Sequence, residues 1–150
     1  MPKIAIIGAG SVVFTRRLLG DVLSFPSIRD SEIWLMDVDP ERLEMISALG
    51  ERMAKDSGTG ARIEATSDRE KSLDGADYVI TTIRVGDDDE VDRGIPQQYG
   101  VDQAVGDTIG PGGVIKALRT VPVLMDICKD MERLCPDAWL LNYTNPMAIA

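Results

Sequence analysis

The sequence predicts an α/β fold in which a doubly wound parallel sheet forms one domain over residues 1–150. Short apolar runs alternate along the chain with longer segments whose apolar residues recur at helical spacing. The first run leads into a pair of glycines, and the second ends in an aspartate. No repeat, low-complexity tract or linker divides the chain, and its hydrophobic content of 44% is sufficient for one core.

The first two pairs of strand and helix carry the clearest patterns. KIAIIG, residues 3–8, is a continuous apolar run, which is typical of a strand buried on both faces of a parallel sheet. Residues 11–23 change to helical spacing, and the apolar residues available for one face are Phe14, Leu18, Leu19 and Leu23. EIWLMD, residues 32–37, predicts the second strand, and Pro40 follows at a helix start, where its missing N–H costs nothing.

Three further strands are predicted after the second helix. ARIEATSD predicts a strand that ends at Thr66 and leads into a short helix, which either Ser67 or Asp68 can cap. DYVITTI predicts the fourth strand at residues 77–83, and DAWLLN predicts the fifth at residues 137–142. Strands that alternate with helices in this way favour a parallel sheet.

The chain between the fourth and fifth strands is unusual. Residues 84–113 are rich in Gly, Asp and Gln and predict a long loop. Long ordered loops in compact domains are usually functional. Residues 114–134 then predict a long helix, in which Pro122 predicts a kink or a break.

Composition and charge exclude several classes of partner. The net charge of −9 and the pI near 4.4 argue against a broad nucleic-acid-binding surface. No apolar run approaches the roughly 18 residues that span a bilayer, and the apolar start of the chain is too short for a signal peptide. We therefore expect a cytoplasmic protein without nucleic-acid or membrane partners. The lack of histidine removes the commonest general base and a common transition-metal ligand from these residues.

The segment IIGAGSVVF predicts a dinucleotide-binding loop of the Rossmann type. Gly8 permits the tight turn after the first strand, and Gly10 lets the backbone approach a pyrophosphate. Ser11 begins the helix, where exposed N–H groups and the helix dipole favour an anion. Val13 stands where a third glycine is usual, so we expect the helix to lie slightly farther from the sheet.

An acidic residue after the second strand supports this interpretation. Asp37 is the candidate for the carboxylate that accepts hydrogen bonds from the adenosine ribose, although it lies somewhat beyond the roughly 20 residues expected. Asp39 is the competing candidate, and either aspartate could instead merely cap the helix that starts at Pro40. With an acid at this position and no adjacent arginine in its place, NAD is favoured over NADP.

Ligands of open α/β sheets bind beyond the carboxyl ends of the strands. The segments predicted there are TTIRVG, the glycine-rich VGDTIGPGG and NYTNPM, and we expect them to meet where a nicotinamide would lie. Each also has a structural interpretation. The glycines can form a turn, Asn142 and Asn145 can satisfy a turn through their amides, and Arg84 can pair with the acidic residues that follow it.

Five blocks together resemble the N-terminal domain of family-4 glycoside hydrolases: IGAGSVVF, LMDVDPERL, RGIPQQYGV, VGDTIGPGGVIKALRTVPV and CPDAWLLNYTNPMAI. The similarity covers essentially all 150 residues and is greatest to the branch with bacterial α-galactosidases and α-glucosidases. It implies an enzyme that uses NAD⁺ and Mn²⁺ to cleave α-glycosides by oxidation at C3, elimination and addition of water. This family tolerates an apolar residue at the position of the third glycine. The sequence does not decide between α-galactoside, α-glucoside and α-glucuronide.

The resemblance also implies roles for single residues. With Asp39 as the alternative to Asp37, the predicted cofactor-binding residues are Gly8, Gly10, Ser11, Phe14, Asp37, Thr82, Ile83 and Arg84. Asn145 matches the family's asparagine near the sugar, and Asp107 matches a polar position that faces the sugar.

The metal ligands and the base of the family are not matched by these residues. The family's cysteine, histidine and tyrosine follow the Asn-Pro motif, so we expect the Mn²⁺ ligands downstream of residue 150 and assign no catalytic residue. Cys128 and Cys135 precede the motif and do not match the metal cysteine. Tyr143 is likewise not assigned as the base.

We therefore expect the chain to be the NAD-binding N-terminal part of a longer, homo-oligomeric enzyme that binds a small-molecule glycoside. The sheet would then lack its last strands, leaving apolar residues such as Met147 and Ile149 exposed or paired with another copy. Two alternatives are a lactate- or malate-type dehydrogenase and a non-catalytic NAD-sensing module. The GDTIGPGG block counts against the first, and a gene that ends at Ala150 would favour the second.

Overall fold

The computed structural model describes residues 1–86, 90–103 and 108–150. These residues form two compact units. The first comprises residues 1–83 and 130–141, and the second comprises residues 84–129 and 142–150. The first unit contains nearly all of the sheet, and the second contains the segment that follows the fourth strand and most of the longest helix.

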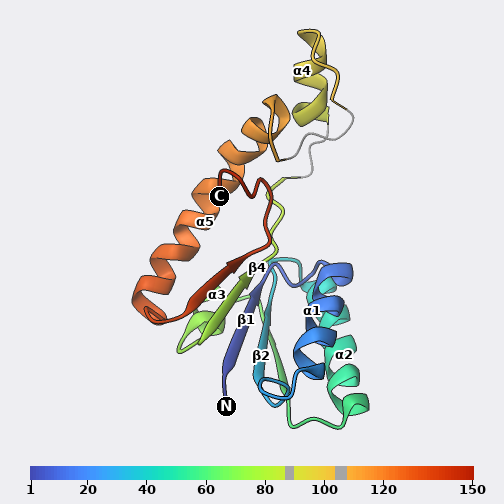
Figure 1. The fold of residues 1–150 in the computed structure, drawn as a ribbon, viewed down its shortest axis with the longest axis vertical. Coiled ribbons are helices and arrows are strands. Elements are labelled where there is room, and N and C mark those ends of the chain that lie inside the picture. The colour runs from blue at the N-terminus through green and yellow to red at the C-terminus, as the bar shows by residue number, and fades with distance from the viewer. Residues whose placement is uncertain (87–89, 104–107) are drawn as a thin grey trace. The chain divides into compact units, whose positions relative to one another are not determined.

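A sheet of five strands forms the centre of the first unit in the described part of the chain, with the order β3-β2-β1-β4-β5. The strands are β1 Lys3–Ile7, β2 Glu32–Met36, β3 Arg62–Thr66, β4 Tyr78–Thr81 and β5 Trp139–Asn142. β1 pairs in parallel with both β2 and β4, and β2 pairs in parallel with β3. The direction of winding reverses between β1 and β4, which places the topological switch point of the sheet there (Figure 1).

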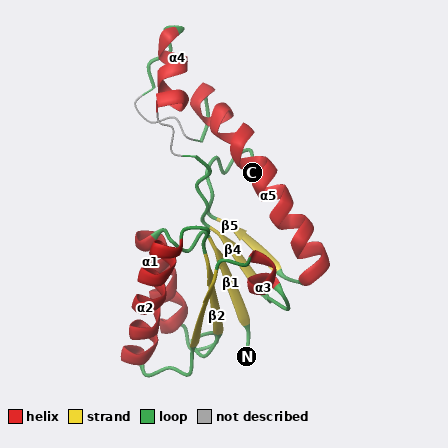
Figure 2. Cartoon of the chain, turned by 180° about the vertical axis from the view of Figure 1, so that it is seen from behind, coloured by secondary structure: helices red, strands yellow, loops and turns green. Residues whose placement is uncertain are grey.

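Helices cover both faces of this sheet. α1 (Val12–Ser24) and α2 (Pro40–Ser57) pack against one another on one face, and α3 (Arg69–Leu73) lies on the opposite face (Figure 2). The core on the side of α1 and α2 contains Ile6, Leu19, Ile33, Leu35 and Ile46, all fully buried. Burial of such side chains stabilises the fold by about 1.5–3 kcal/mol each.

The buried face of α1 differs from the one expected. Phe14 is 52% exposed, and the buried residues are Thr15, Leu19, Val22 and Leu23. Thr15 can take a core position because its Oγ1 donates a hydrogen bond of 2.7 Å to the carbonyl oxygen of Ala9. The face of α1 toward the sheet therefore carries the polar Thr15, and not the aromatic Phe14 that was expected there.

The third strand and the helix after it follow the prediction closely. β3 ends at Thr66, and the carboxylate of Asp68 caps α3 by accepting hydrogen bonds from the N–H groups of Glu70 and Lys71. Of the two capping candidates, Asp68 is therefore the one used. β4 is shorter than expected, so that Thr82 and Ile83 lie just beyond its carboxyl end.

Ion pairs fasten α3 to the last turns of α5 (Pro111–Leu134) within the first unit. Arg69 donates to Asp130 through Nε at 2.8 Å, and Arg133 donates to both Glu70 and Asp130. Burial alone would raise the pKa of the Asp130 carboxyl, but the hydrogen bonds and charges of Arg69 and Arg133 outweigh it and hold that pKa below its usual value.

α5 also corrects two expectations. It begins at Pro111, three residues earlier than expected, and it continues through Pro122, so of the predicted kink or break the break does not occur. A proline inside a helix removes one backbone hydrogen bond, which a helix of 24 residues tolerates when its other turns remain bonded. Leu124, Ile127 and Met131 on its C-terminal half are buried.

The segment between β4 and α5 is not simply a loop. Its described residues include a π-helical turn at Glu90–Gly94 that leads directly into the short helix α4 (Ile95–Gln98). Proline at the second position of α4 lacks an N–H that the helix start would leave unpaired in any case. The expectation of one long loop is therefore wrong for this part of the segment.

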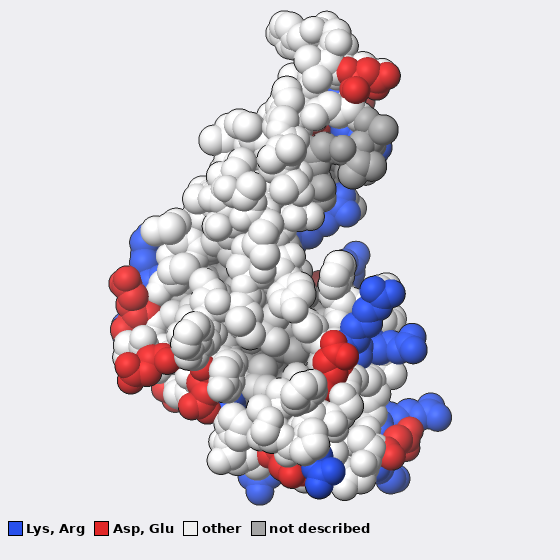
Figure 3. All heavy atoms as spheres, viewed as in Figure 1, with Lys and Arg blue, Asp and Glu red and all other residues white. Residues whose placement is uncertain are grey.

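The surface carries charges of both signs. Much of the face drawn in Figure 3 is uncharged, and both acidic and basic side chains appear on it. No helix in the described ranges combines the length and the apolar character that a membrane-crossing segment requires.

Candidate dinucleotide-binding site

The turn between β1 and α1 leaves no room for a side chain. Gly8 has a φ of +89°, and a Cβ there would lie 2.8 Å from the carbonyl carbon of Thr82. The N–H groups of Gly8 and Ala9 both donate hydrogen bonds of 2.9 Å to the carbonyl oxygen of Met36. Backbone from β1 is therefore held between the ends of β2 and β4, at the switch point of the sheet.

Thr82 joins the exit of β4 to this turn. Its N–H donates to the carbonyl oxygen of Ile7 at 2.8 Å, and its Oγ1 donates to the carbonyl oxygen of Gly8 at 2.9 Å. Ile83 follows directly, with its backbone nitrogen 2.9 Å from the position of a Cβ on Gly8. The structure thus brings two of the predicted cofactor residues after β4 against the glycine turn.

Asp37 is the first residue after β2, and its carboxylate faces the same turn. Oδ2 accepts a hydrogen bond of 2.7 Å from the N–H of Gly10, and Oδ1 accepts one of 2.9 Å from the N–H of Asp39. A Cβ on Gly10 would lie 2.7 Å from Oδ2 of Asp37, so glycine is required for this approach. Turn residues between α1 and β2 account for a spacing longer than the usual roughly 20 residues.

Asp39 has a different position. Its Oδ1 accepts hydrogen bonds from the N–H groups of Glu41 at 3.0 Å and Arg42 at 3.1 Å, which is the geometry of a helix N-cap. The capping interpretation therefore describes Asp39. Asp37 instead accepts a hydrogen bond from the N–H of Gly10 at the glycine turn, and this geometry favours it as the ribose carboxylate.

The first turn of α1 is open to solvent. The N–H of Ser11 donates to the carbonyl oxygen of Gly8 at 3.3 Å, and the Ser11 side chain makes no capping hydrogen bond. Val13 is 63% exposed, so its side chain does not separate the helix from the sheet, and the expected displacement of the helix has no steric cause. Phe14 is exposed beside it. An apolar residue in place of the third glycine therefore imposes no packing penalty here.

The other predicted residues belong to the second unit or lie outside the described residues. Arg84 and Asn145 are in the second unit, and both are exposed. Asn142 satisfies the turn after β5, because its Oδ1 accepts a hydrogen bond of 2.9 Å from the N–H of Thr144. Asn145 precedes a cis peptide bond to Pro146. Asp107, the other predicted sugar-facing residue, lies outside the described residues.

Arg119 is a prominent residue of the second unit that sequence reasoning missed. Its guanidinium forms two hydrogen bonds with the carboxylate of Asp92, of 2.7 and 2.8 Å, and its Nε donates to the carbonyl oxygen of Val85 at 3.3 Å. These contacts tie the segment after β4 to α5. The only signal in the sequence is that Arg119 falls within the block VGDTIGPGGVIKALRTVPV.

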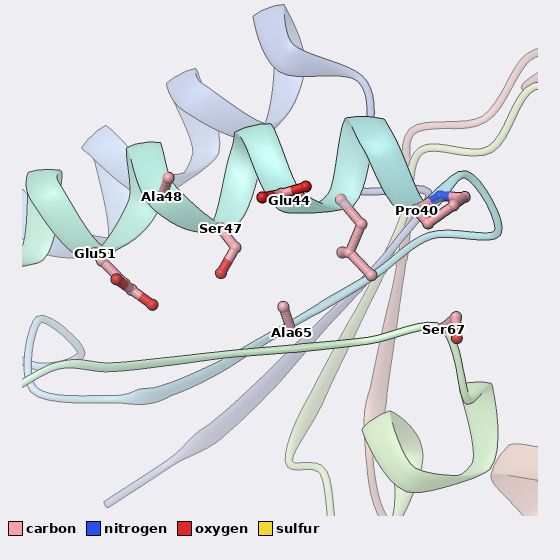
Figure 4. Close-up of a pocket in the computed structure, with 8 residues that line it drawn as sticks. Pro40, Glu44, Ser47, Ala48, Glu51, Ala65 and Ser67 are labelled. Carbon is pink, nitrogen blue, oxygen red and sulfur yellow. The ribbon is translucent and has the colours of Figure 1, made fainter.

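Among the described residues there is no metal-binding cluster, and the pocket between α2 and β3 includes none of the predicted site residues. The described part of the chain contains no group of three or more Asp, Glu, Cys or His side chains that could hold a metal ion. A pocket of about 390 Å³ lies between α2 and β3 (Figure 4). It is lined by Pro40, Leu43, Glu44, Ser47, Ala48, Glu51, Ala65 and Ser67. None of these is a predicted cofactor or substrate residue, so the pocket is not the candidate site.

A parallel sheet with a switch point, a glycine turn at that point and a carboxylate facing the turn define a Rossmann-type fold. Residues 3–150 match the model of the family described as family 4 glycosyl hydrolase. The chain belongs to this family, as its motifs predict.

Curated relatives cover nearly the whole chain. The α-galactosidase of Rhizobium meliloti (strain 1021) is 47% identical over 98% of this chain and 31% of its own length. The α-galactosidase of Bacillus subtilis (strain 168) is 45% identical over 99% of this chain and 35% of its own length. The α-glucosidase of Erwinia rhapontici is 42% identical over 97% of this chain and 33% of its own length. The chain thus spans about a third of the length of the relatives it matches.

Solved structures agree with the fold. The 6-phospho-beta glucosidase from Thermotoga maritima, solved with manganese, NAD⁺ and glucose-6-phosphate, is 30% identical with a TM-score of 0.84, over 96% of this chain and 35% of that one. A lactate dehydrogenase from Cryptosporidium parvum is 18% identical with a TM-score of 0.66, over 97% of this chain and 38% of that one. The second likeness shows the fold alone, whereas the family is that of the glycosidases.

Proposed function

We propose that these residues form the NAD-binding domain of a family-4 glycosidase that hydrolyses α-glycosides. The observation that carries the proposal is the hydrogen bond of 2.7 Å between the N–H of Gly10 and the carboxylate of Asp37. It supports the proposal because it joins, at the switch point of the sheet, the turn that would lie against the pyrophosphate to the carboxylate that would bind the ribose. In this proposal both compact units serve one domain of a longer enzyme.

The residues at the turn fit the dinucleotide. Gly8 and Gly10 carry no side chain, so the backbone there is bare and can lie against a pyrophosphate. The N–H groups in the first turn of α1 have no partners within the helix and can donate to a phosphate oxygen. The carboxylate of Asp37 can accept hydrogen bonds from the two ribose hydroxyls.

The remaining predicted residues complete the proposed cofactor site. Thr82 and Ile83 lie against Gly8, where the chain leaves β4. Ser11 and Phe14 begin α1, and Phe14 offers an exposed apolar ring next to the turn. We assign Arg84 to the nicotinamide half of the cofactor, and Asn145 and Asp107 to the sugar, on the strength of the family motifs alone.

Bound NAD⁺ would supply a hydride acceptor and donor at C3 of the sugar. The protein's own contribution would be to bind the pyrophosphate and the ribose, to fix their orientation and to hold the exit of β4 beside them. Thr82 would keep the turn in place through its hydrogen bond to the carbonyl oxygen of Gly8.

The residues described here do not fit the metal site of the proposed enzyme. A relative has been solved with manganese, but the described residues offer no cluster of ligands, and the chain has no histidine. We therefore assign the Mn²⁺ ligands to residues outside this chain and derive no catalytic step through the metal. The homo-oligomer implied by the family resemblance and the cytoplasmic location expected from the sequence are part of the same proposal.

Among the sugars, we propose an α-galactoside as the first candidate. The two α-galactosidases are 45% and 47% identical to the chain, and the α-glucosidase is 42% identical. The difference is small, and the sugar is a small-molecule partner whose recognition would depend largely on residues outside this chain.

Activity of the longer enzyme that contains this chain tests the proposal. The enzyme is freed of bound cofactor and assayed on p-nitrophenyl α-galactoside and α-glucoside, each with and without NAD⁺ and Mn²⁺. We expect hydrolysis only with both present, and a slower rate when the substrate carries deuterium at C2 or C3. Hydrolysis that does not respond to NAD⁺ would contradict the proposed chemistry.

A further inference from the structure

An arginine lies beside the glycine turn, although no arginine is adjacent to Asp37 in the sequence. The Cβ of Arg42 is 3.0 Å from the position that a Cβ on Gly10 would occupy. Arg42 reaches this place because α2 starts immediately after Asp39, and the first helical turn of α2 brings Arg42 back toward the glycine turn. Its side chain is 67% exposed, so the guanidinium is accessible to a ligand.

The guanidinium of Arg42 is already paired. Its Nε lies 3.2 Å from Oδ2 of Asp39, and Asp39 also accepts a hydrogen bond from the Arg42 backbone N–H. The same aspartate therefore caps the helix and holds the arginine side chain. Asp37, with a second negative charge, is linked to Asp39 through the hydrogen bond of 2.9 Å that it accepts from the Asp39 N–H.

These charges bear on the choice between NAD and NADP. A carboxylate at this point of the fold accepts hydrogen bonds from the ribose 2′-hydroxyl of NAD, and the 2′-phosphate of NADP is repelled by it. An arginine nearby can accommodate that phosphate, because guanidinium binds phosphate with paired hydrogen bonds. This chain places both kinds of residue at one turn.

We propose that Arg42 is a latent ligand for a 2′-phosphate. Asp39 keeps its guanidinium occupied while Asp37 excludes the phosphate, so the chain prefers NAD. When both carboxylates are replaced, Arg42 becomes available and binds NADP. The inference rests on the proposed function, since it requires a dinucleotide at this turn.

The test is a set of binding titrations with NAD⁺ and NADP⁺, measured by calorimetry at fixed ionic strength. The variants are Asp37→Ser/Asp39→Ser, the same pair with Arg42→Ala, and Arg42→Ala alone. Serine keeps a hydrogen-bonding group at the ribose position and an N-cap on α2. Arg52→Ala is the matched control, because Arg52 is an exposed arginine of the same helix that lies 3.7 Å from its own partner, Asp56.

We expect the wild type to bind NAD⁺ more tightly than NADP⁺. The double serine variant should gain about tenfold or more in NADP⁺ affinity, which is typical for one hydrogen-bonded charge pair. Arg42→Ala in that background should remove the gain, and higher salt should reduce it. Arg52→Ala should change neither affinity. Circular dichroism checks that each variant is folded. If the double variant unfolds, Asp39→Ser alone is measured in its place. This variant keeps the contact of Asp37 with Gly10 and should show part of the gain in NADP⁺ affinity.

Three outcomes are distinguishable. A gain in NADP⁺ affinity that persists without Arg42 would overturn the role of Arg42. Equal weakening of NAD⁺ and NADP⁺ by Arg42→Ala would overturn it as well, because it would indicate contact with the shared adenine. A wild type that binds neither dinucleotide would contradict the proposed function itself, and the inference would fall with it.

Discussion

The carboxylate of Asp37 accepts a hydrogen bond of 2.7 Å from the N–H of Gly10, which is 27 residues earlier in the chain. This contact closes the end of β2 onto the turn that follows β1. Because a carboxylate binds an N–H more strongly than a neutral oxygen does, it also fixes the position of the turn before any ligand arrives. Gly10 and Asp37 are also the residues proposed to lie against the pyrophosphate and to bind the ribose.

Replacement of Asp37 by alanine should therefore affect both binding and stability. The N–H of Gly10 would lose a charged partner, which costs about 1–3 kcal/mol when the donor is shielded from water. NAD⁺ affinity should fall about tenfold or more, as expected for loss of a carboxylate bound to the ribose. Calorimetry and urea unfolding measure the two effects. Asp56→Ala, an exposed aspartate near the other end of α2, is the control and should change both by little.

Gly10→Ala and Gly20→Ala should change stability in opposite directions. A Cβ on Gly10 would lie 2.7 Å from Oδ2 of Asp37, whereas a Cβ on Gly20 would find its nearest atom, Cε of Met53, at 3.9 Å. Gly20 is inside α1, where alanine is more favourable than glycine by roughly 0.5–1 kcal/mol. We expect Gly10→Ala to unfold at lower urea concentration and to lose NAD⁺ binding, and Gly20→Ala to unfold at higher concentration and to bind normally. Normal binding by Gly10→Ala would show that the backbone at this turn does not approach a ligand.

The hydroxyl of Thr15 should contribute measurably to the stability of the glycine turn. Thr15 is fully buried, and its Oγ1 donates a hydrogen bond of 2.7 Å to the carbonyl oxygen of Ala9. Thr15→Val keeps the shape but removes the donor, so it should lower the free energy of unfolding by about 1 kcal/mol. Thr120→Val is the comparison, since the Thr120 hydroxyl donates to the backbone carbonyl oxygen of Lys116 within a helix. A smaller loss at Thr15 than at Thr120 would contradict this account of the turn.

The ion pairs of Asp130 predict a dependence of stability on pH. The folded-state pKa of Asp130 lies below the ordinary value of an aspartate, so its contribution to stability is present above that ordinary value and is lost as the pH falls through the folded pKa. Urea unfolding between about pH 6 and 3 should show this decline in the wild type. Asp130→Asn should be less stable at pH 6 and should show a smaller decline. An equal decline in both proteins would assign the acid sensitivity to other carboxylates.

Local pattern predicted much of the fold. Apolar runs, continuous or alternating, identified the strands, and Asp68 and Pro40 marked helix starts, because these signals arise within a few residues of one another. Gly8 and Gly10 indicated the turn for the same reason. The family motifs, confirmed by the match over residues 3–150, added the class of enzyme that short-range pattern could not supply.

Features that depend on distant partners were not predicted. The guanidinium of Arg119 binds Asp92 at a separation of 27 residues, and no periodic pattern connects the two. Arg42 lies beside Gly10 only because α1, β2 and the start of α2 fold back on the turn. Thr15 was assigned no role since a buried threonine is recognised only when its acceptor is known.

NAD⁺ titration of the isotope-labelled protein, followed by the NMR signals of its backbone N–H groups, tests the central claim most directly. The account predicts that the largest shifts occur at Gly8, Gly10 and Ser11, with smaller ones at Thr82. Shifts confined to the residues of the pocket between α2 and β3, such as Ser47 and Ala48, would contradict it. So would a titration that leaves the glycine turn unchanged at NAD⁺ concentrations that saturate the longer enzyme.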